Sequence, residues 1–340
     1  VATLWKRVPS QYRQGAPLLI LAGDPEDYPI ELHYLVRPLL FAREPTILFG
    51  LGGAAKGWLS VAIAMMAGCG VSHCGLVVPR PATFLYLDWE SSETELNRRI
   101  ALLKAGGLTP EAHIPYRRCA APLADDLEDI MEMAAGVAAD GVVIDSLLGA
   151  CGEDLERNQG VSRFFRAFRS LGVAGLLVAH TQKNTPEKDR TAFGSGFWTF
   201  QARSVWQARI DAEPGQNEIA VGLTHEKVNM GRRLAPLGFR FTFQKSQTGD
   251  QDMAVTMTPT DPASIPGTLK NEVIDRLRLK AAIQQAPGSV STVKNLSEST
   301  GLGVDTVRMV LNREKKMFLH RGYIGKEVLW GEVYHDTHQL

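Results

Sequence analysis

The sequence predicts an α/β protein with a large domain on a largely parallel sheet, followed by a small domain of helices and a β-hairpin. Between about residues 46 and 243, short apolar runs alternate with amphipathic stretches, which is typical of strands covered by helices on both faces. A glycine-rich turn with a lysine stands between the first of these strands and a helix. The 340 residues also exceed what one hydrophobic core usually fills, so a second domain is expected.

Four buried strands and two crossover helices are expected in the large domain. The strands are TILFG (46–50), ATFLYLD (82–88), GVVID (141–145) and VAGLLVA (173–179). Apolar residues at helical spacing over 127–138 and 161–171 predict the two helices. Residues 204–243 predict further strands, antiparallel to one another, that extend the sheet at one side.

The stretch FGLGGAAKGWLS (49–60) departs at two positions from a standard phosphate-binding loop. Ala55 replaces a glycine, and its methyl group is tolerated only at a negative φ angle. Gly57 replaces the Ser or Thr that binds Mg²⁺, and a water molecule supported by Asp145 and the phosphates is expected to take that coordination position. The residues expected to bind the cofactor are Gly50, Gly52, Gly53, Ala54, Ala55, Lys56, Gly57 and Trp58.

Polar side chains at the ends of the next strands predict the chemistry of the site. Asp88 and Glu90 follow the second strand, where a carboxylate either activates the attacking water or caps the next helix. Asp145 ends the third strand in the Walker B pattern of a magnesium ligand. His180 follows the fourth strand, where it is placed to sense the outer phosphate and to signal to the loop 181–196.

The rest of the chain predicts the domain borders. Residues 1–45 are expected to be a lead-in segment, 46–245 the large domain and 246–267, with few large apolar side chains, a linker. Residues 268–340 predict three helices, with a glycine-containing turn before the third, and then a hairpin. This order is that of a winged helix-turn-helix.

Composition and charge narrow the class of protein. Apolar residues make up 44% of the chain and charged residues 22%, which excludes a disordered or fibrous protein. Basic and acidic residues both number 37, so affinity for nucleic acid requires a local patch. With no apolar run of about 18 residues, no signal-peptide pattern and no disulfide framework, a cytoplasmic protein without a membrane partner is expected.

Together these motifs resemble the RepA-type branch of the RecA-fold ATPases, a family of plasmid and phage replicative helicases related to DnaB. The resemblance covers about residues 30–245, in LVRPLLFAREPTILFGLGGAAKGWLSVAIAMMAG, FLYLDWESSETELNRRIALL, GVVIDSLLGACGED and THEKVNMGRR. It implies a RecA-like P-loop NTPase core with ATP and Mg²⁺ as cofactors. It also implies a ring, expected to be a hexamer, with single-stranded DNA passing through it.

The resemblance also implies roles for single residues. They are phosphate binding by Lys56, catalysis by the Glu90 carboxylate, the Walker B role of Asp145 and phosphate sensing by His180. Arg203 and Lys227 match the positions from which one subunit reaches its neighbour's nucleotide. For these two, a solvated basic residue on a strand is the alternative.

Basic residues predict contacts with DNA in both domains. Those of the C-terminal domain are Arg308, Arg313, Lys315, Lys316 and Arg321, and those of the loop after His180 are Lys183, Lys188 and Arg190. A replication partner is the alternative ligand of the C-terminal domain.

The sequence therefore predicts a ring-forming ATPase that acts on DNA, as a replicative helicase or remodelling motor of a mobile element. The alternative is a DNA-binding regulator whose nucleotide site hydrolyses little or no ATP, which the missing hydroxyl at Gly57 favours. A small-molecule kinase is disfavoured, because no arginine-rich lid is evident.

Overall fold

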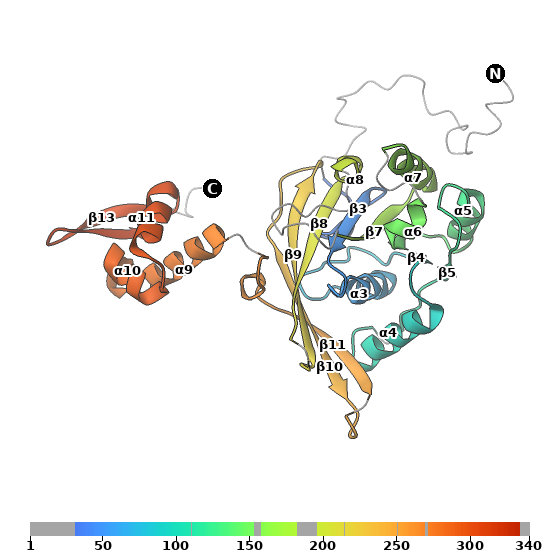
Figure 1. Ribbon diagram of the computed structural model, residues 1–340, viewed down its shortest axis with the longest axis horizontal. Coiled ribbons are helices and arrows are strands. Elements are labelled where there is room, and N and C mark those ends of the chain that lie inside the picture. The colour runs from blue at the N-terminus through green and yellow to red at the C-terminus, as the bar shows by residue number, and fades with distance from the viewer. Residues whose placement is uncertain are drawn as a thin grey trace, which may run out of the picture. The chain divides into compact units, whose positions relative to one another are not determined.

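The chain divides into two compact units, Val1–Ile265 and Pro266–Leu340 (Figure 1). The computed structural model describes residues 31–109, 111–152, 158–181, 196–213, 215–249, 251–268 and 271–333. Each unit has a hydrophobic core of its own.

The first unit is built on a nine-stranded sheet in the order β11-β10-β9-β8-β3-β7-β6-β4-β5. The strands are β3 (Pro45–Gly50), β4 (Phe84–Asp88), β5 (Tyr116–Arg118), β6 (Gly141–Asp145), β7 (Ala174–His180), β8 (Ser204–Asp211), β9 (Glu218–Val228), β10 (Leu237–Lys245) and β11 (Asp252–Pro259). From β8 to β5 all neighbours are parallel, whereas β9, β10 and β11 are antiparallel to the strand before them. This mixed α/β architecture with a large, mostly parallel sheet confirms the predicted fold class.

Helices cover both faces of the sheet, which explains the unbroken apolar runs of the central strands (Figure 1). The helices are α3 (Lys56–Cys69), α4 (Glu93–Ala105), α5 (Leu127–Gly136), α6 (Leu147–Cys151), α7 (Asn158–Leu171) and α8 (Gly196–Gln201). Residues of α3 and α4 share one core with Leu48 and Val143, and residues of α5, α6 and α7 share the other with Ile47 and Ile144. Successive residues of a strand thus point to opposite cores.

Residues 31–45 belong to the first unit, so the prediction of a lead-in segment was wrong for them. Strands β1 (Tyr34–Val36) and β2 (Leu40–Phe41) pair with each other, and their buried apolar side chains join the core of α3. The first 30 residues of the predicted lead-in lie outside the described residues.

The predicted linker 246–267 was also wrong over most of its length. Strand β11 pairs with β10 from Phe239 opposite Pro259 to Lys245 opposite Asp252, and a short 3-10 helix, η2 (Pro262–Ser264), follows. Val255 and Met257 are buried in the same core as α3 and α4. The first unit therefore includes this edge strand and ends at Ile265.

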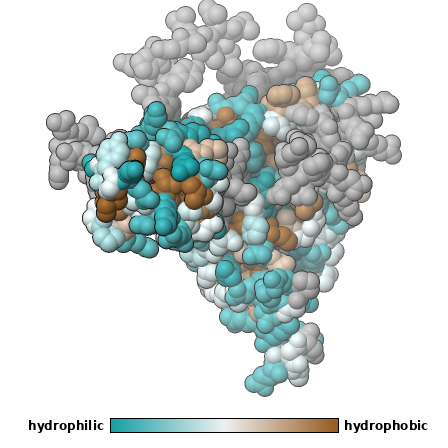
Figure 2. All heavy atoms as spheres, turned by 60° about the vertical axis from the view of Figure 1, so that its left-hand side comes forward, coloured by the Kyte–Doolittle hydropathy of each residue, from teal (hydrophilic) through white to brown (hydrophobic). Residues whose placement is uncertain are grey.

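The described residues of the second unit form three α-helices and a three-stranded sheet of order β12-β14-β13. Its elements are α9 (Asn271–Gln285), η3 (Pro287–Ser289), β12 (Val290–Thr292), α10 (Val293–Thr300), α11 (Val304–Arg313), β13 (Phe318–Ile324) and β14 (Glu327–Glu332). Gly301, at a φ of 72°, ends α10, and Gly325, at a φ of 60°, forms the tight turn of the hairpin. Hydrophobic side chains gather among hydrophilic ones on the face of this unit that Figure 2 brings forward.

Two further expectations can be compared with the structure. In the described part of the chain, no helix combines the length and the apolar character needed to cross a membrane. None of the four cysteines forms a disulfide, and only Cys119 is fully buried.

Candidate nucleotide-binding site

Four neighbouring strands, β3, β7, β6 and β4, end at the same edge of the sheet. The residues that follow them include those predicted to act on a nucleotide bound by the same chain. The carboxyl ends of these strands surround a cavity of about 440 Å³. Its walls include Lys56, Glu90, Asp145 and His180, together with the loop from Gly53 to Trp58. This is the edge at which open parallel sheets bind their ligands.

Gly50 and Gly52 precede the part of the loop that lines the cavity, and only Gly50 lies where a side chain would clash. A Cβ on Gly50 would lie 2.5 Å from the carbonyl oxygen of Ala208 on β8, whereas nothing lies within 4 Å of one on Gly52. Gly50 is therefore needed for the packing of neighbouring strands, which is a different reason from the close approach of a phosphate.

Lys56 is buried in the first turn of α3 and folds back over its own loop. Its Nζ donates to the carbonyl oxygens of Gly50 at 3.0 Å and Leu51 at 2.8 Å. Burial lowers the pKa of Lys56 to about 8, against the attraction of Asp145 and Glu90. A bound anion would favour the charged ammonium. Lys56 is thus placed to bind phosphate, and the two carbonyl oxygens accept its hydrogen bonds when no phosphate is bound.

Ala55 has a left-handed backbone conformation, with φ 50° and ψ 18°, as the N-cap of α3. The expectation of a negative φ angle at this position was therefore wrong. The helix itself begins at Lys56. A left-handed alanine costs roughly 1–2 kcal/mol, so the loop adopts a conformation that suits glycine and bears the strain of a methyl group.

Ala55→Gly is expected to raise the free energy of unfolding by about 1 kcal/mol, because relief of the strained φ angle outweighs the added freedom of the unfolded chain. Denaturant unfolding of the full chain measures this. A matched control is Ala101→Gly on the exposed side of α4, which is expected to lower the free energy of unfolding by about 1 kcal/mol. Equal destabilisation by both changes would contradict the left-handed assignment.

Asp145 is buried at the end of β6, in register with Asp88 on β4. Its Oδ2 accepts a hydrogen bond from the Tyr86 hydroxyl at 2.7 Å. Burial raises the pKa of Asp145, and the Tyr86 hydrogen bond and the charge of Arg99 oppose this rise. The carboxylate is thus oriented within the site.

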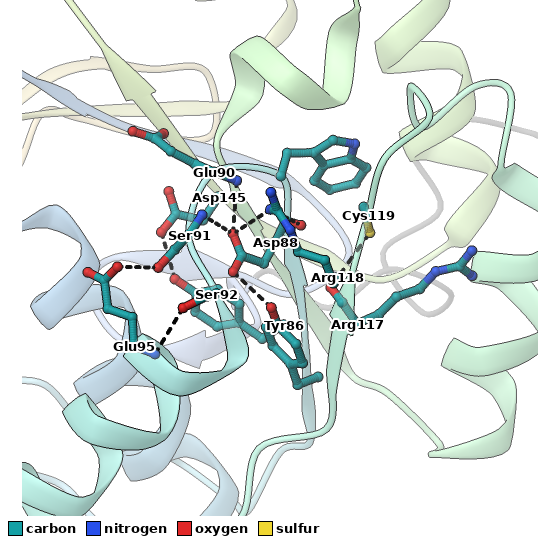
Figure 3. A network of polar contacts seen from close by, with 12 residues as sticks. Tyr86, Asp88, Glu90, Ser91, Ser92, Glu95, Arg117, Arg118, Cys119 and Asp145 are labelled. Atoms are coloured by element: carbon teal, nitrogen blue, oxygen red, sulfur yellow. Dashed lines mark hydrogen bonds and ion pairs between the residues drawn. The ribbon is translucent and has the colours of Figure 1, made fainter.

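Asp88 shapes the turn that carries Glu90. Its Oδ1 accepts the backbone N–H groups of Glu90 at 2.9 Å and Ser91 at 2.7 Å (Figure 3). Its Oδ2 accepts a hydrogen bond from the Tyr116 hydroxyl at 3.0 Å. The cap of α4 is Ser92, whose side chain accepts the Glu95 N–H at 3.2 Å. The Asp88 carboxylate is thus engaged by the turn after β4, where it positions Glu90, and the helix cap is Ser92.

Glu90 and His180 face each other at the rim of the cavity. The Nε2 atom of His180 lies 3.1 Å from both carboxylate oxygens of Glu90. The hydrogen bond from His180 is the main cause that lowers the pKa of Glu90 to about 2. His180, the expected phosphate sensor, thus makes the Glu90 carboxylate, the expected general base, a weaker base.

Arg203 and Lys227 lie near the amino-terminal ends of β3 and β8, at the edge of the sheet away from the cavity. Thr46, near the start of β3, pairs with Ser204, and Lys227 pairs with Val205. Lys227 Nζ donates to the carbonyl oxygens of residues at the end of α8, namely Thr199, Phe200 and Ala202. Arg203 Nε lies 3.6 Å from Glu44 Oε2. Neither reaches the cavity of its own chain, and their role toward a neighbouring subunit stays a prediction.

The basic residues predicted to contact DNA have different surroundings. Lys315 and Lys316 are exposed after α11. Arg308 pairs with Asp305 at 3.5 Å, and Arg313 lies 3.6 Å from Glu314. Arg321 Nη2 donates to the Glu332 carbonyl oxygen at 2.6 Å and so joins β13 to β14. Lys183, Lys188 and Arg190 lie outside the described residues.

The structure adds one residue that the sequence predictions missed, Arg99 on α4. Its guanidinium group lies in the cavity wall against Gly57. The signal in the sequence was Gly57 itself, because a glycine in place of a hydroxyl residue leaves room for another side chain.

Residues 14–186 match a family described as AAA domain. The chain belongs to this family. The mostly parallel sheet, with the glycine-rich loop and Lys56 between β3 and α3, makes its AAA domain a RecA-like P-loop core. No curated protein matches the chain. Among solved structures it is similar to a KaiC-like protein of the archaeon Pyrococcus horikoshii OT3, with a TM-score of 0.45 and 14% identity over 68% of this chain and 100% of that one.

The side chains of this AAA domain fit a nucleoside triphosphate with one bound magnesium ion. The N-terminus of α3 and the Lys56 ammonium suit phosphate oxygens. Asp145 supplies a hard oxygen ligand, and Gly57 supplies none. The described residues contain no group of three or more His, Cys, Asp or Glu that could hold a metal ion. Because Mg²⁺ keeps several waters and binds through one or two carboxylates together with substrate phosphates, the Asp145 carboxylate fits it.

Proposed function

We propose that this AAA domain hydrolyses ATP and that a ring of its subunits uses the reaction to move along or remodel DNA. The observation that carries the proposal is the meeting of Lys56, Glu90, Asp145 and His180 at one cavity. Nucleotide hydrolysis needs charge neutralisation, a group that activates water and an oriented carboxylate for Mg²⁺. A motor also needs a group that responds to the outer phosphate, which is the role proposed for His180.

The side chains divide this work in a way that follows from their contacts. Lys56, which donates to the carbonyl oxygens of Gly50 and Leu51, would donate to phosphate oxygens instead. Asp145, which Tyr86 orients, would hold the metal ion or its waters. Mg²⁺, when bound, supplies positive charge to the phosphates. Glu90 becomes the stronger base when His180 turns its hydrogen bond toward the phosphate, because that bond is the main cause of the low pKa of Glu90.

The ring is proposed on the position of Arg203 and Lys227. Both lie at the sheet edge opposite the cavity, so they can serve a nucleotide site only in another subunit. Six subunits are the expected number, and single-stranded DNA is the expected occupant of the channel. The mobile element to which such a motor would belong follows only from the resemblance to plasmid and phage helicases.

The second unit is proposed to be a winged helix-turn-helix that binds DNA. Supporting this, α10 and α11 are joined at Gly301, and a hairpin with a two-residue turn follows α11. Lys315 and Lys316 add exposed positive charge next to α11. A replication partner is the alternative ligand of this unit.

Steady-state phosphate release, measured with and without single-stranded DNA, tests the proposed function. A motor is expected to release phosphate and to do so faster with DNA, whereas a regulator with a nucleotide switch would bind nucleotide without turnover. Light scattering after size exclusion, run with a nonhydrolysable nucleotide and Mg²⁺, tests the ring. A monomer under every condition would contradict the roles of Arg203 and Lys227.

Changing both Lys315 and Lys316 to Ala is expected to reduce the salt dependence of duplex binding by the full chain. The slope of log K against log salt should fall in size by about 1 to 2, since each lost phosphate contact removes about 0.9. Fluorescence anisotropy over a salt series measures the slope. The control is Lys245→Ala, an exposed lysine at the end of β10. An unchanged slope in the double variant would argue for a protein ligand of this unit.

A further inference from the structure

We propose that Arg99 binds the phosphates of the nucleotide and supplies positive charge that a standard loop obtains through its hydroxyl and magnesium ion. This inference rests on the proposed function, because it needs a nucleoside triphosphate in the cavity. It predicts that nucleotide binding depends less on Mg²⁺ than in a loop with Ser or Thr at position 57.

The first observation is the close fit between Gly57 and Arg99. A Cβ built on Gly57 would overlap the Arg99 guanidinium group, with Cζ at 3.0 Å and Nη2 at 3.3 Å. Position 57 is where the standard pattern places the hydroxyl that binds magnesium. A side chain there would push the guanidinium group away, so glycine at this position admits arginine to the site.

The second observation is that neighbouring side chains hold Arg99 in place. Its Nη2 donates to Glu95 Oε1, one helical turn earlier, and Glu95 Oε2 accepts a hydrogen bond from Ser91 at 2.6 Å (Figure 3 shows the Ser91–Glu95 contact). Its Cζ also lies 5.8 Å from the centre of the Trp58 ring. The Nη1 atom, the closest to Gly57, is thereby presented at the N-terminus of α3.

The third observation concerns where this charge acts. Arg99 lines the same cavity as Lys56 and Asp145, and its side chain is only 19% exposed. A guanidinium group stays charged at every physiological pH and donates to phosphate with paired N–H groups. Beside the N-terminus of α3, it adds fixed positive charge where the missing hydroxyl would have held a metal ion.

Isothermal titration of the full chain with AMP-PNP, in Mg²⁺ and in EDTA, tests the proposal. The unchanged protein is expected to lose less than about fivefold in affinity when Mg²⁺ is removed. Arg99→Gln should bind about 30-fold more weakly than the unchanged protein in EDTA, through loss of a charge-assisted contact, but only about threefold more weakly in Mg²⁺. Arg99→Lys should recover part of the affinity in EDTA, since it keeps the charge.

A matched control is Arg98→Gln, which changes the preceding arginine of α4. The Arg98 side chain is 61% exposed and lies 3.9 Å from Asp252, so its replacement should leave both affinities unchanged. Gly57→Ser tests the same contact by changing the loop residue instead of the arginine. By displacing Arg99 and restoring a hydroxyl, it should make binding strongly dependent on Mg²⁺.

Several outcomes would overturn the proposal. One is that Arg99→Gln binds AMP-PNP in EDTA as tightly as the unchanged protein does. Another is that Arg99→Gln loses the same affinity in Mg²⁺ as in EDTA, which a purely structural role of the Arg99–Glu95 pair predicts. A third is that nucleotide binding by Gly57→Ser depends no more on Mg²⁺ than binding by the unchanged protein. The last comparison decides the matter if the Arg99 variants do not fold. Failure of the unchanged, folded protein to bind nucleotide in either buffer would instead overturn the proposed function, and this inference with it.

Discussion

Glu90→Gln is expected to lower the rate of phosphate release by roughly 10²–10⁴-fold, the usual contribution of a general base, without weakening nucleotide binding. The amide keeps the size of the side chain and can still accept a hydrogen bond from His180, but it cannot take a proton from water. The loop contacts of Lys56 do not involve Glu90, so the phosphate-binding groups stay in place. Single-turnover phosphate release and titration with AMP-PNP measure the two quantities separately.

Glu93→Gln is the matched control, because Glu93 is exposed in the first turn of the same α4 helix. It makes the same change in charge near the site and is expected to keep the rate of the unchanged protein. Retained turnover in Glu90→Gln would remove the role of base from Glu90. Loss of nucleotide binding in that variant would show that the carboxylate acts in binding.

Lys56→Ala is expected to weaken nucleotide binding by at least about 100-fold, since loss of one partner of a buried charged contact usually costs 2–5 kcal/mol. The lysine is buried in the wall of the cavity, and no other lysine of the described residues lines it. The fold should survive, because burial already disfavours the Lys56 charge, whose pKa is lowered to about 8. Thermal unfolding checks the fold and titration with AMP-PNP measures the affinity.

Lys245→Ala, which removes an exposed lysine that does not line the cavity, serves again as the control. It should bind nucleotide as the unchanged protein does. Tight binding by a folded Lys56→Ala protein would mean that the Lys56 ammonium does not act on the phosphates. Arg99 and the N-terminus of α3 would then be the groups to test next.

The sequence predicted the central strands because their environment leaves a direct signal. Buried on both faces, β3, β4, β6 and β7 must be almost wholly apolar, and parallel strands place their ends at one edge. Strands at the margins give no such signal. β11 has the sequence DMAVTMTP, in which polar and apolar residues mix without a long apolar run, and β5 consists of Tyr116, Arg117 and Arg118. A pattern of this kind fits a loop as well as an edge strand.

In the candidate site too, local sequence patterns predict some residues and miss others. Lys56, Glu90, Asp145 and His180 follow strands or a glycine-rich turn, so their meeting at one edge could be predicted. The left-handed Ala55 could not, because the φ angle is imposed by the loop as a whole. The position of Arg99 depends on how α4 packs beside α3, which no local stretch of sequence encodes.

Calorimetric titration of the unchanged full chain with AMP-PNP at pH 7 and millimolar Mg²⁺ tests the central claim most directly. At this pH the Lys56 ammonium, with a pKa of about 8, carries its charge. The predicted result is saturable uptake of one nucleotide per chain, which Lys56→Ala abolishes or severely weakens. A folded protein that takes up neither adenine nor guanine nucleotides would contradict the account.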